Sequence, residues 1–176
     1  MNTKTSKVFG ETERLILRKM NADDFNEISQ IMRSQSVQKI WEHCFTDVDI
    51  KDWIKKNQDL YSSQNLGYFL AIEKQTGKAA GQIALMPDTI DGKIYYEIGY
   101  ILKKEFMKKG FALEGAGFMA DYAFKKLGLK EVIFEIRPVN TPSIKVAEKL
   151  GAKNIGSFIK NVRGKKMEHF IFILNT

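Results

Sequence analysis

The sequence predicts a mixed α/β domain in which helices cover both faces of one mostly antiparallel sheet of about seven strands. Apolar residues recur with helical spacing in some segments and alternate with a period of two in others, so both element types are expected. Residues 94–136 predict a strand, a long helix and a strand, which requires a right-handed crossover and two parallel strands. Short turns join the strands of the surrounding hairpins, which are therefore antiparallel. The predicted order is β-α-α-β-β-β-α-β-α-β-β, with residues 1–176 as one domain.

The first third of the chain supplies one strand and two helices. Alternating apolar side chains predict the opening strand over residues 14–19. Polar residues that can cap a helix stand before two apolar stripes, and they predict helices over residues 21–33 and 46–60. A loop or a short helical turn is expected over residues 41–45, between these helices. Residues 1–7 are polar, and we expect them to be flexible.

The remaining two thirds supply the other strands and helices, with turn or capping residues between them. Asp91-Gly92 predicts a hairpin turn, Gly128 the end of a helix and Pro142 the start of one. The predicted strands span residues 68–73, 80–86, 94–102, 131–136, 154–162 and 166–174, and the predicted helices span residues 111–127 and 142–150.

Composition and charge argue against several classes of protein. The chain has one cysteine and two histidines, so an internal disulfide is excluded and a cysteine- or histidine-rich metal centre is not expected. No apolar run reaches the roughly 20 residues of a membrane span, and no signal segment follows the polar start. We therefore expect a metal-free, cytoplasmic protein without membrane contact. The net charge of +7 comes from scattered lysine pairs, so nucleic acid is not the expected partner.

One junction between a strand and a helix carries a ligand-binding signal. The strand that ends near Leu102 is followed by a short basic loop with Gly110, and an apolar helix begins at once. Glycine allows the backbone to approach a ligand closely, and the first turn of a helix presents unpaired N–H groups. The helix dipole, Lys108 and Lys109 add positive potential. The junction therefore predicts a site for a small phosphorylated ligand, with a diphosphate on the backbone amides.

A competing interpretation of the same helix is a dinucleotide site. Residues 115–120 match the pattern G-x-G-x-x-A, and Glu135 stands twenty residues after Gly115. That fingerprint has to begin in the tight turn directly after a strand. Gly115 instead falls inside the predicted helix, several residues after Gly110. Close packing of the helix on a sheet explains these small residues better, so a nicotinamide or flavin site is rejected.

Four stretches resemble the GNAT acetyltransferases, in the branch that contains the ribosomal-protein N-terminal (RimJ/RimL-like) acetyltransferases and their small-amine relatives. They are the opening strand (residues 12–18), the central strand (96–100), the pyrophosphate loop (108–114) and the segment that closes the fold (140–143 with 148–152). The resemblance covers most of the chain and implies a GNAT-like fold. It also implies an enzyme that uses acetyl-CoA as cosubstrate to acetylate an amine.

The resemblance further implies which residues bind acetyl-CoA. In the family, backbone amides of the pyrophosphate loop hold the diphosphate, and the end of the central strand bonds the pantetheine arm and polarises the thioester. Met107 stands where the family usually has Gln or Arg, but the loop binds mainly through its backbone, so we expect binding to persist. The implied cofactor-binding residues are Tyr100, Ile101, Leu102, Met107, Lys108, Lys109, Gly110, Phe111, Ala112, Asn140 and Ser143.

Glu97 is the expected general base. It is an acid in an otherwise apolar strand, where a charge is costly without a purpose, and a glutamate satisfied by a structural partner is the alternative. A positioned carboxylate can accept the proton that an attacking amine must lose. Many relatives carry a tyrosine, the usual general acid, at the position of Ala147. Ser143, or a water held by Asn140, is the candidate to protonate the CoA thiolate here, with helix capping as the alternative role.

The acceptor pocket is expected between the first two helices, where relatives build part of it and where Trp41, His43 and Phe45 lie. Cys44 has no activating motif, so direct transfer through a ternary complex is predicted. The acceptor is a primary amine, either on a protein N-terminus or on a small molecule, and a homodimer is left open. The alternative function is a catalytically silent CoA-binding sensor, or a nucleic-acid- or ribosome-associated binding module.

Overall fold

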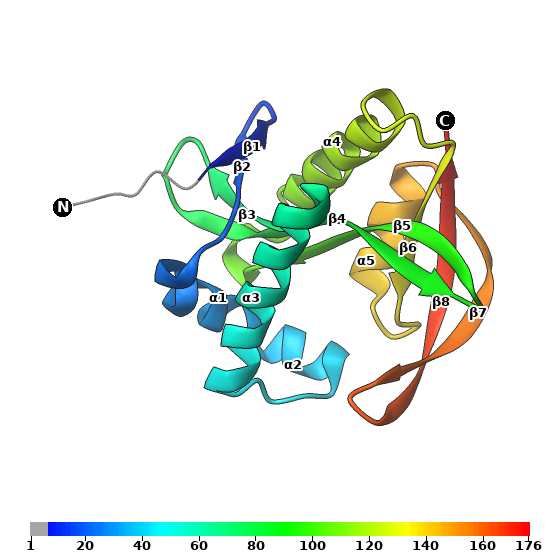
Figure 1. The fold of residues 1–176 in the computed structure, drawn as a ribbon, viewed down its shortest axis with the longest axis horizontal. Helices are drawn as coiled ribbons and strands as arrows, with labels where there is room; N and C mark the ends of the chain where they lie inside the picture. The colour runs from blue at the N-terminus through cyan, green and yellow to red at the C-terminus, as the bar shows by residue number, and fades with distance from the viewer. Residues whose placement is uncertain (1–6) are drawn as a thin grey trace.

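In the computed structural model, which describes residues 7–176, eight strands form one sheet in the order β1-β2-β3-β4-β5-β6-β8-β7 (Figure 1). The strands are β1 (Val8–Glu11), β2 (Leu15–Arg18), β3 (Gly67–Glu73), β4 (Ala79–Ile90), β5 (Lys93–Leu102), β6 (Glu131–Ile136), β7 (Lys153–Val162) and β8 (Lys165–Asn175). The helices are α1 (Phe25–Met32), α2 (Gln35–Trp41), α3 (Asp47–Gln64), α4 (Phe111–Lys125) and α5 (Thr141–Lys149), with short 3-10 helices η1 (Ala22–Asp24) and η2 (Lys104–Phe106). None of the helices in this described part is both long and apolar enough to cross a membrane.

The predicted fold class is confirmed, and β5-α4-β6 is its parallel unit. The other neighbouring strands pair antiparallel. β5 and β6 pair only where Glu97 lies opposite Ile133. β5 continues to Leu102 and β6 to Ile136 without a further pair, so the two strands separate toward their carboxyl ends. This separation positions the candidate site.

Helices α3 and α4 cover opposite faces of the sheet. Successive side chains of a strand point to opposite faces, so Gln82 and Ile83 of β4 mark the two faces of the sheet. Trp53 of α3 donates its indole N–H to Gln82 Oε1 at 2.8 Å, whereas Gly115 of α4 packs on Ile83. A Cβ at Gly115 would lie 2.8 Å from the Ile83 side chain. Close packing against the sheet therefore explains this glycine, as predicted.

The structure has one strand and one helix more than the sequence predicted. The additional strand, β1, has only four residues, and one of them is Gly10, so it shows no detectable alternation. A Cβ at Gly10 would lie 2.4 Å from the ring of Phe118, so packing requires the glycine. The additional helix, α2, ends at Trp41 and shortens the predicted loop. Of the stretch expected to be flexible, residues 1–6 lie outside the described residues.

Local signals for the first two predicted helices are confirmed. Asn21 caps η1, which leads directly into α1, and Thr46 caps α3. In both capping boxes the cap side chain accepts from a backbone N–H, and Asp24 or Asp49 accepts from the backbone N–H of the cap residue. The Thr46 box fixes the start of α3, the helix that carries Trp53 to the cavity.

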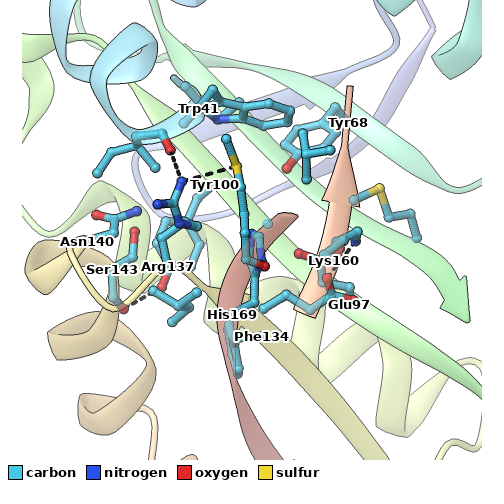
Figure 2. A pocket seen from close by; sticks show the side chains of 18 of the residues that line it. Trp41, Tyr68, Glu97, Tyr100, Phe134, Arg137, Asn140, Ser143, Lys160 and His169 are labelled. Atoms are coloured by element: carbon cyan, nitrogen blue, oxygen red, sulfur yellow. Dashed lines mark hydrogen bonds and ion pairs between the residues drawn. The ribbon is translucent and has the colours of Figure 1, made fainter. Parts of the chain in front are cut away.

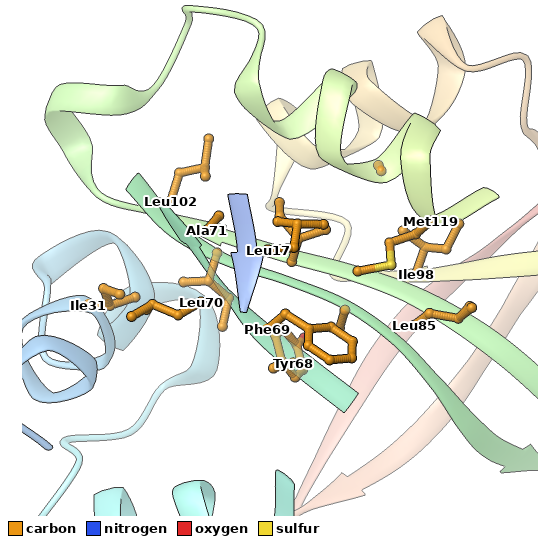
Figure 3. Packing of buried hydrophobic residues seen from close by; sticks show 14 of the residues in the cluster. Leu17, Ile31, Tyr68, Phe69, Leu70, Ala71, Leu85, Ile98, Leu102 and Met119 are labelled. Carbon is orange, nitrogen blue, oxygen red and sulfur yellow. The ribbon is translucent and has the colours of Figure 1, made fainter. Parts of the chain in front are cut away.

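A continuous apolar core supports the site (Figure 3). Leu17, Phe69 and Leu85 of three different strands are fully buried, as are Met119 of α4 and Ile31 of α1. Each such side chain contributes about 1.5–3 kcal/mol relative to its exposed state. The strands that carry the candidate site therefore belong to a sheet with a closely packed core.

Candidate active site

A cavity of about 540 Å³ lies where β5 and β6 separate (Figure 2). Its lining comes from α2, α3, the strands β3 to β8 and the start of α5. The predicted site residues that line it are Trp41, Glu97, Tyr100, Ile101, Asn140 and Ser143. The predicted site residues that do not line it are His43, Phe45, Leu102, Met107, Lys108, Lys109, Gly110, Phe111 and Ala112.

Glu97 lies at the point where the two parallel strands begin to separate, and its residue is only 8% exposed. No hydrogen bond to its carboxylate is found among the residues that the structure describes. Burial, reinforced by the negative charge of Glu135, raises the pKa of Glu97 to about 8, although Lys160 opposes the rise. A carboxylate with this pKa beside a cavity can exchange a proton near neutral pH.

Glu97 belongs to a network of three acids and one lysine. Carboxylate oxygens of Asp88, Glu97 and Glu135 all lie within 4.8 Å of one another. Lys160 Nζ lies 2.6 Å from Glu135 Oε2 and also forms an ion pair with Asp88. Burial lowers the pKa of Lys160, but Glu97 and Glu135 raise it by more, so its ammonium persists. Lys160 supplies the cation of the network, and the expectation of a metal-free site stays a prediction.

An aromatic wall lines another part of the cavity. The rings of Trp41 and Trp53 meet edge to face at 5.8 Å, and Trp53 lies 4.8 Å from the ring of Tyr68. Figure 2 shows Trp41 and Tyr68 on the opposite side of the cavity from Phe134 and His169. Such a wall can pack against the apolar part of an amine or accept its cation on the ring faces.

The loop after α2 and the hairpin between β7 and β8 are fastened together beside this wall. Arg163 of the hairpin lies 2.6 Å from Asp49, which also contacts His43 Nε2 at 3.0 Å. Lys165 Nζ donates to the carbonyl of Glu42 at 2.7 Å. His43 therefore serves this junction, while Phe45 is only 4% exposed and packs in the core.

The start of α5 forms the side of the cavity that faces β5. The hydroxyl of Tyr100 donates to the backbone carbonyl of Ser143 at 2.8 Å, which fixes α5 against the strand. Burial raises the pKa of Tyr100. Asn140 is the N-cap residue of α5, but its side chain makes no capping bond and is free to meet a ligand. Ala147 is fully buried, is not among the residues that line the cavity and carries no group that could donate a proton.

The predicted pyrophosphate loop has a backbone suited to an anion. Gly110 adopts φ +86° and caps α4 without a side-chain bond. The first helical backbone bond runs from Glu114 N–H to Gly110 O at 3.0 Å. The N–H groups of Phe111, Ala112 and Leu113 have no protein acceptor within residues 7–176. Unpaired N–H groups at a helix N-terminus fit a phosphate, so this loop could hold the diphosphate of a nucleotide cofactor.

Arg14 of the opening segment holds this loop from outside. Its guanidinium donates to the carbonyl of Lys109 at 2.9 Å and lies 4.5 Å from the ring centre of Phe111. The same guanidinium pairs with Glu114 at 2.6 Å, and Thr12 also bonds that carboxylate. Burial opposes the ionisation of Glu114, yet these hydrogen bonds lower its pKa overall. The opening strand and the loop, about 100 residues apart in sequence, are thus one unit.

Sequence reasoning missed the members of the acid–lysine network other than Glu97. The signal that identified Glu97 could also have identified Glu135, because Glu135 is also an acid inside an apolar strand. Lys160 and Asp88 carried no such signal. Lys160 lies in an exposed polar strand, and Asp88 lies beyond the predicted end of its strand.

Known proteins with similar sequence and structure are acetyltransferases. The model for an acetyltransferase (GNAT) domain matches residues 14–153. The chain is 33% identical over 168 residues to an uncharacterized N-acetyltransferase, p20, of Bacillus licheniformis, with 93% of each chain covered. A GNAT-family acetyltransferase structure from Bacillus anthracis has a TM-score of 0.77 at 26% identity, covering 94% of this chain and 96% of that one. A putative ribosomal-protein-serine acetyltransferase structure from Vibrio cholerae shares the fold, with a TM-score of 0.79 at 22% identity and the same coverage.

Proposed function

Because the chain belongs to the acetyltransferase (GNAT) family and is an acetyl-CoA-dependent N-acetyltransferase, we propose that it acetylates a primary amine by direct attack in a ternary complex, with Glu97 as general base. The single observation that carries this proposal is the position of Glu97. Its carboxylate lies at the cavity, where β5 and β6 part, with a pKa raised to about 8. A general base works best when its pKa is near the working pH.

Two separate features support the binding of acetyl-CoA. The unpaired N–H groups at the start of α4 suit the diphosphate, and the end of β5 lines the cavity toward which the pantetheine arm would run. Ile101 at that end of β5 and Asn140 at the start of α5 would flank the arm. The cosubstrate would thus enter between the separated strands and present its thioester near Glu97.

The chemical step then needs one proton acceptor and one proton donor. The neutral amine attacks the thioester carbonyl, a C–N bond forms, and Glu97 accepts the proton that the nitrogen loses. The C–S bond breaks and the electron pair leaves with the CoA sulfur. The hydroxyl of Ser143, or a water bonded to Asn140, would return a proton to that thiolate, because Ala147 offers none.

The cavity suits an acceptor with an apolar body next to its amine. Trp41, Trp53 and Tyr68 provide the apolar wall, while Glu97 provides the acidic end. Both a small-molecule amine and the N-terminus of a protein meet this description. Of the cavity residues, Trp41 is the predicted acceptor contact that the proposal retains. The cytoplasmic location and the homodimer stay predictions.

Thiol release from acetyl-CoA across a panel of amines tests the proposal. The panel contains a polyamine, free amino acids, an aminoglycoside and short peptides with free N-termini. We expect turnover with at least one member, and we expect Glu97→Gln to reduce that turnover without weakening the binding of acetyl-CoA. Binding of CoA without turnover on any member would favour the sensor, whose support is the missing tyrosine at Ala147. Turnover that Glu97→Gln leaves unchanged would overturn the role of the base.

A further inference from the structure

The acid–lysine network joins groups that lie far apart in the sequence. Asp88 lies on β4, Glu97 on β5, Glu135 on β6 and Lys160 on β7. Glu97, Glu135 and Lys160 line the cavity, and Figure 2 shows Glu97 beside Lys160. The side chain of Glu135 is only 2% exposed, and that of Asp88 is 28% exposed. Three members of the network therefore border the cavity, and Asp88 joins them from outside its lining.

The network has more negative than positive charge when every acid is ionised. Lys160 offers one ammonium to three carboxylates, and within residues 7–176 it forms ion pairs with Asp88 and Glu135 but none with Glu97. Glu135 Oε1 is buried and has no hydrogen-bond donor among the described residues. A buried acceptor without a donor is costly, but a protonated carboxyl carries its own donor.

A shared proton resolves this conflict. Burial raises the pKa of Glu135 to about 7, and neighbouring Asp88 adds to the rise. Burial acts against ionisation of Asp88 too, but Lys160 lowers its pKa overall, so Asp88 is the better acceptor. The protonated carboxyl of Glu135 can then donate a hydrogen bond to the Asp88 carboxylate, and both groups keep a hydrogen-bonding partner.

We propose that Asp88, Glu135 and Lys160 are positioning residues for Glu97, holding a shared proton beside it until just below its working pH and setting the pH at which its carboxylate becomes available to the amine. The proposal rests on the function proposed above, in which Glu97 is the base. Glu97 has no hydrogen bond of its own in the described structure, so the charges of its neighbours adjust an ionisation that burial already disfavours. A hydrogen-bonded partner shifts the pKa of an ordinary buried acid, and for Glu97 the charges of the network have that role.

The groups around Glu97 act on it in opposite directions. The acids Glu135 and Asp88 disfavour its charge, while the cations Lys160 and Lys56 of α3 favour it. Tyr68 of β3 and Tyr100 of β5 are neutral in this pH range, because burial raises the pKa of each hydroxyl. His169 of β8 faces Lys160 and Asp88, and burial lowers its pKa, so it too is neutral when the base works. Lys160 and Glu135 are therefore the two neighbours whose charges act most strongly, and in opposite directions, on the ionisation of Glu97.

Two substitutions should move the ionisation of Glu97 in opposite directions. Glu135 loses its proton near pH 7, before Glu97 ionises, and is then a negative neighbour. Glu135→Gln removes that charge at nearly constant shape, so Glu97 should ionise about one pH unit lower. Lys160→Met removes the cation with the larger effect on Glu97, so Glu97 should ionise about one pH unit higher. Lys160→Met also leaves buried acids without a cation and can fail to fold. The double variant Glu135→Gln/Lys160→Met restores the balance of charge and should titrate between the two.

The test measures the ionisation directly and the rate separately. Carbon-13 NMR of labelled glutamate carboxyls follows Glu97, whose signal is assigned by its loss in Glu97→Gln. The pH profile of kcat/KM for acetyl transfer is recorded on the same variants. Glu131→Gln is the matched control, because Glu131 lies on the same strand as Glu135 but pairs with Lys93 outside the network. We expect the control to leave both measurements unchanged.

The two measurements separate failure of this proposal from failure of the proposed function. We expect the NMR titration and the rate profile to move together, downward in pH for Glu135→Gln and upward for Lys160→Met. An NMR titration of Glu97 that stays in place in Glu135→Gln, or that lies at the same pH in Glu135→Gln and in the double variant, overturns the network. An NMR titration that moves while the rate profile stays supports the network and removes Glu97 as the base.

Discussion

At the acetyl-CoA end of the site the expected donors are backbone N–H groups of three consecutive residues, whereas at the base end the acting groups are side chains from four strands. Phe111, Ala112 and Leu113 present those N–H groups whatever their side chains are. At the other end, Glu97 depends on Glu135 and Lys160, which no local sequence pattern links to it. One end is a property of a turn and a helix start, and the other is a property of the assembled sheet.

This difference implies different tolerance to substitution. A backbone site survives changes of side chain, which is why Met107 in place of the family's usual Gln or Arg need not abolish binding. A network of buried charges loses balance when one member is removed, because the remaining charges stay buried. Substitutions at the base end should therefore affect the chemical step strongly, and substitutions at the acetyl-CoA end should affect KM more mildly.

The sharpest test of the contrast is Glu97→Gln. The variant keeps the shape of the side chain but cannot accept a proton, so kcat should fall on the order of 10²-fold or more. KM for acetyl-CoA should stay within the error of the wild type, since the loop before α4 does not share the cavity lining with Glu97. A steady-state titration with acetyl-CoA measures both constants. Equal loss in kcat and in acetyl-CoA affinity would show that the two ends do not act separately.

The wild-type pH profile belongs to the same test. The pKa of Glu97 is raised to about 8, so its base form increases as the pH rises through that value. The rate of acetyl transfer should therefore rise with pH over this range and then level off. In Glu97→Gln the rise of the rate near pH 8 should disappear from the pH profile.

The second test addresses the acetyl-CoA end from outside the loop. Arg14→Ala removes the bonds to Lys109 and Glu114 that fix the loop before α4. Loss of a charged hydrogen bond that orders the site should raise KM for acetyl-CoA roughly tenfold, with kcat nearly unchanged. Lys125→Ala is the control, because Lys125 pairs with Asp121 on the same helix but at its far end. A fall in kcat with constant KM would place Arg14 at the base end instead.

The same contrast explains what the sequence could predict. The mixed sheet, the order of elements and the loop at Gly110 follow from periodicity, caps and glycines within short segments, and the structure confirms the fold. The strand β1 and the helix α2 were missed because their local signals are weak. Lys160 was missed because only the pairing of β7 with β8, and of β8 with β6, brings it near Glu135. Contacts of that kind are fixed by tertiary pairing and leave no spacing to detect.

A third, smaller effect is expected where the two ends meet. Asn140 caps α5 without a side-chain bond and lines the cavity, so Asn140→Ala should cost little stability. If the amide meets the pantetheine arm, losing one neutral hydrogen bond should weaken acetyl-CoA binding roughly fivefold. Isothermal titration with CoA measures the affinity, and thermal denaturation serves as the stability control. A lowered melting temperature with constant affinity would mean that Asn140 is structural.

The smallest expected effect is on stability, and it measures how much the ionisation of buried Glu97 lowers the free energy of unfolding. In the unfolded chain Glu97 loses its proton near the ordinary pKa of 4.5, but in the folded chain it keeps the proton up to about pH 8. Over that interval the folded state binds more protons, so the contribution of Glu97 to the free energy of unfolding falls as the pH rises. Gln carries no such penalty, so Glu97→Gln should melt a few degrees higher than the wild type at pH 8, with the gap closing toward pH 4.5. Melting curves of both proteins from pH 4.5 to 9, with Glu131→Gln as control, measure the gap. A gap that does not change with pH would mean that the folded protein leaves Glu97 at its ordinary ionisation, and the base end would then lose the feature that separates it from the acetyl-CoA end.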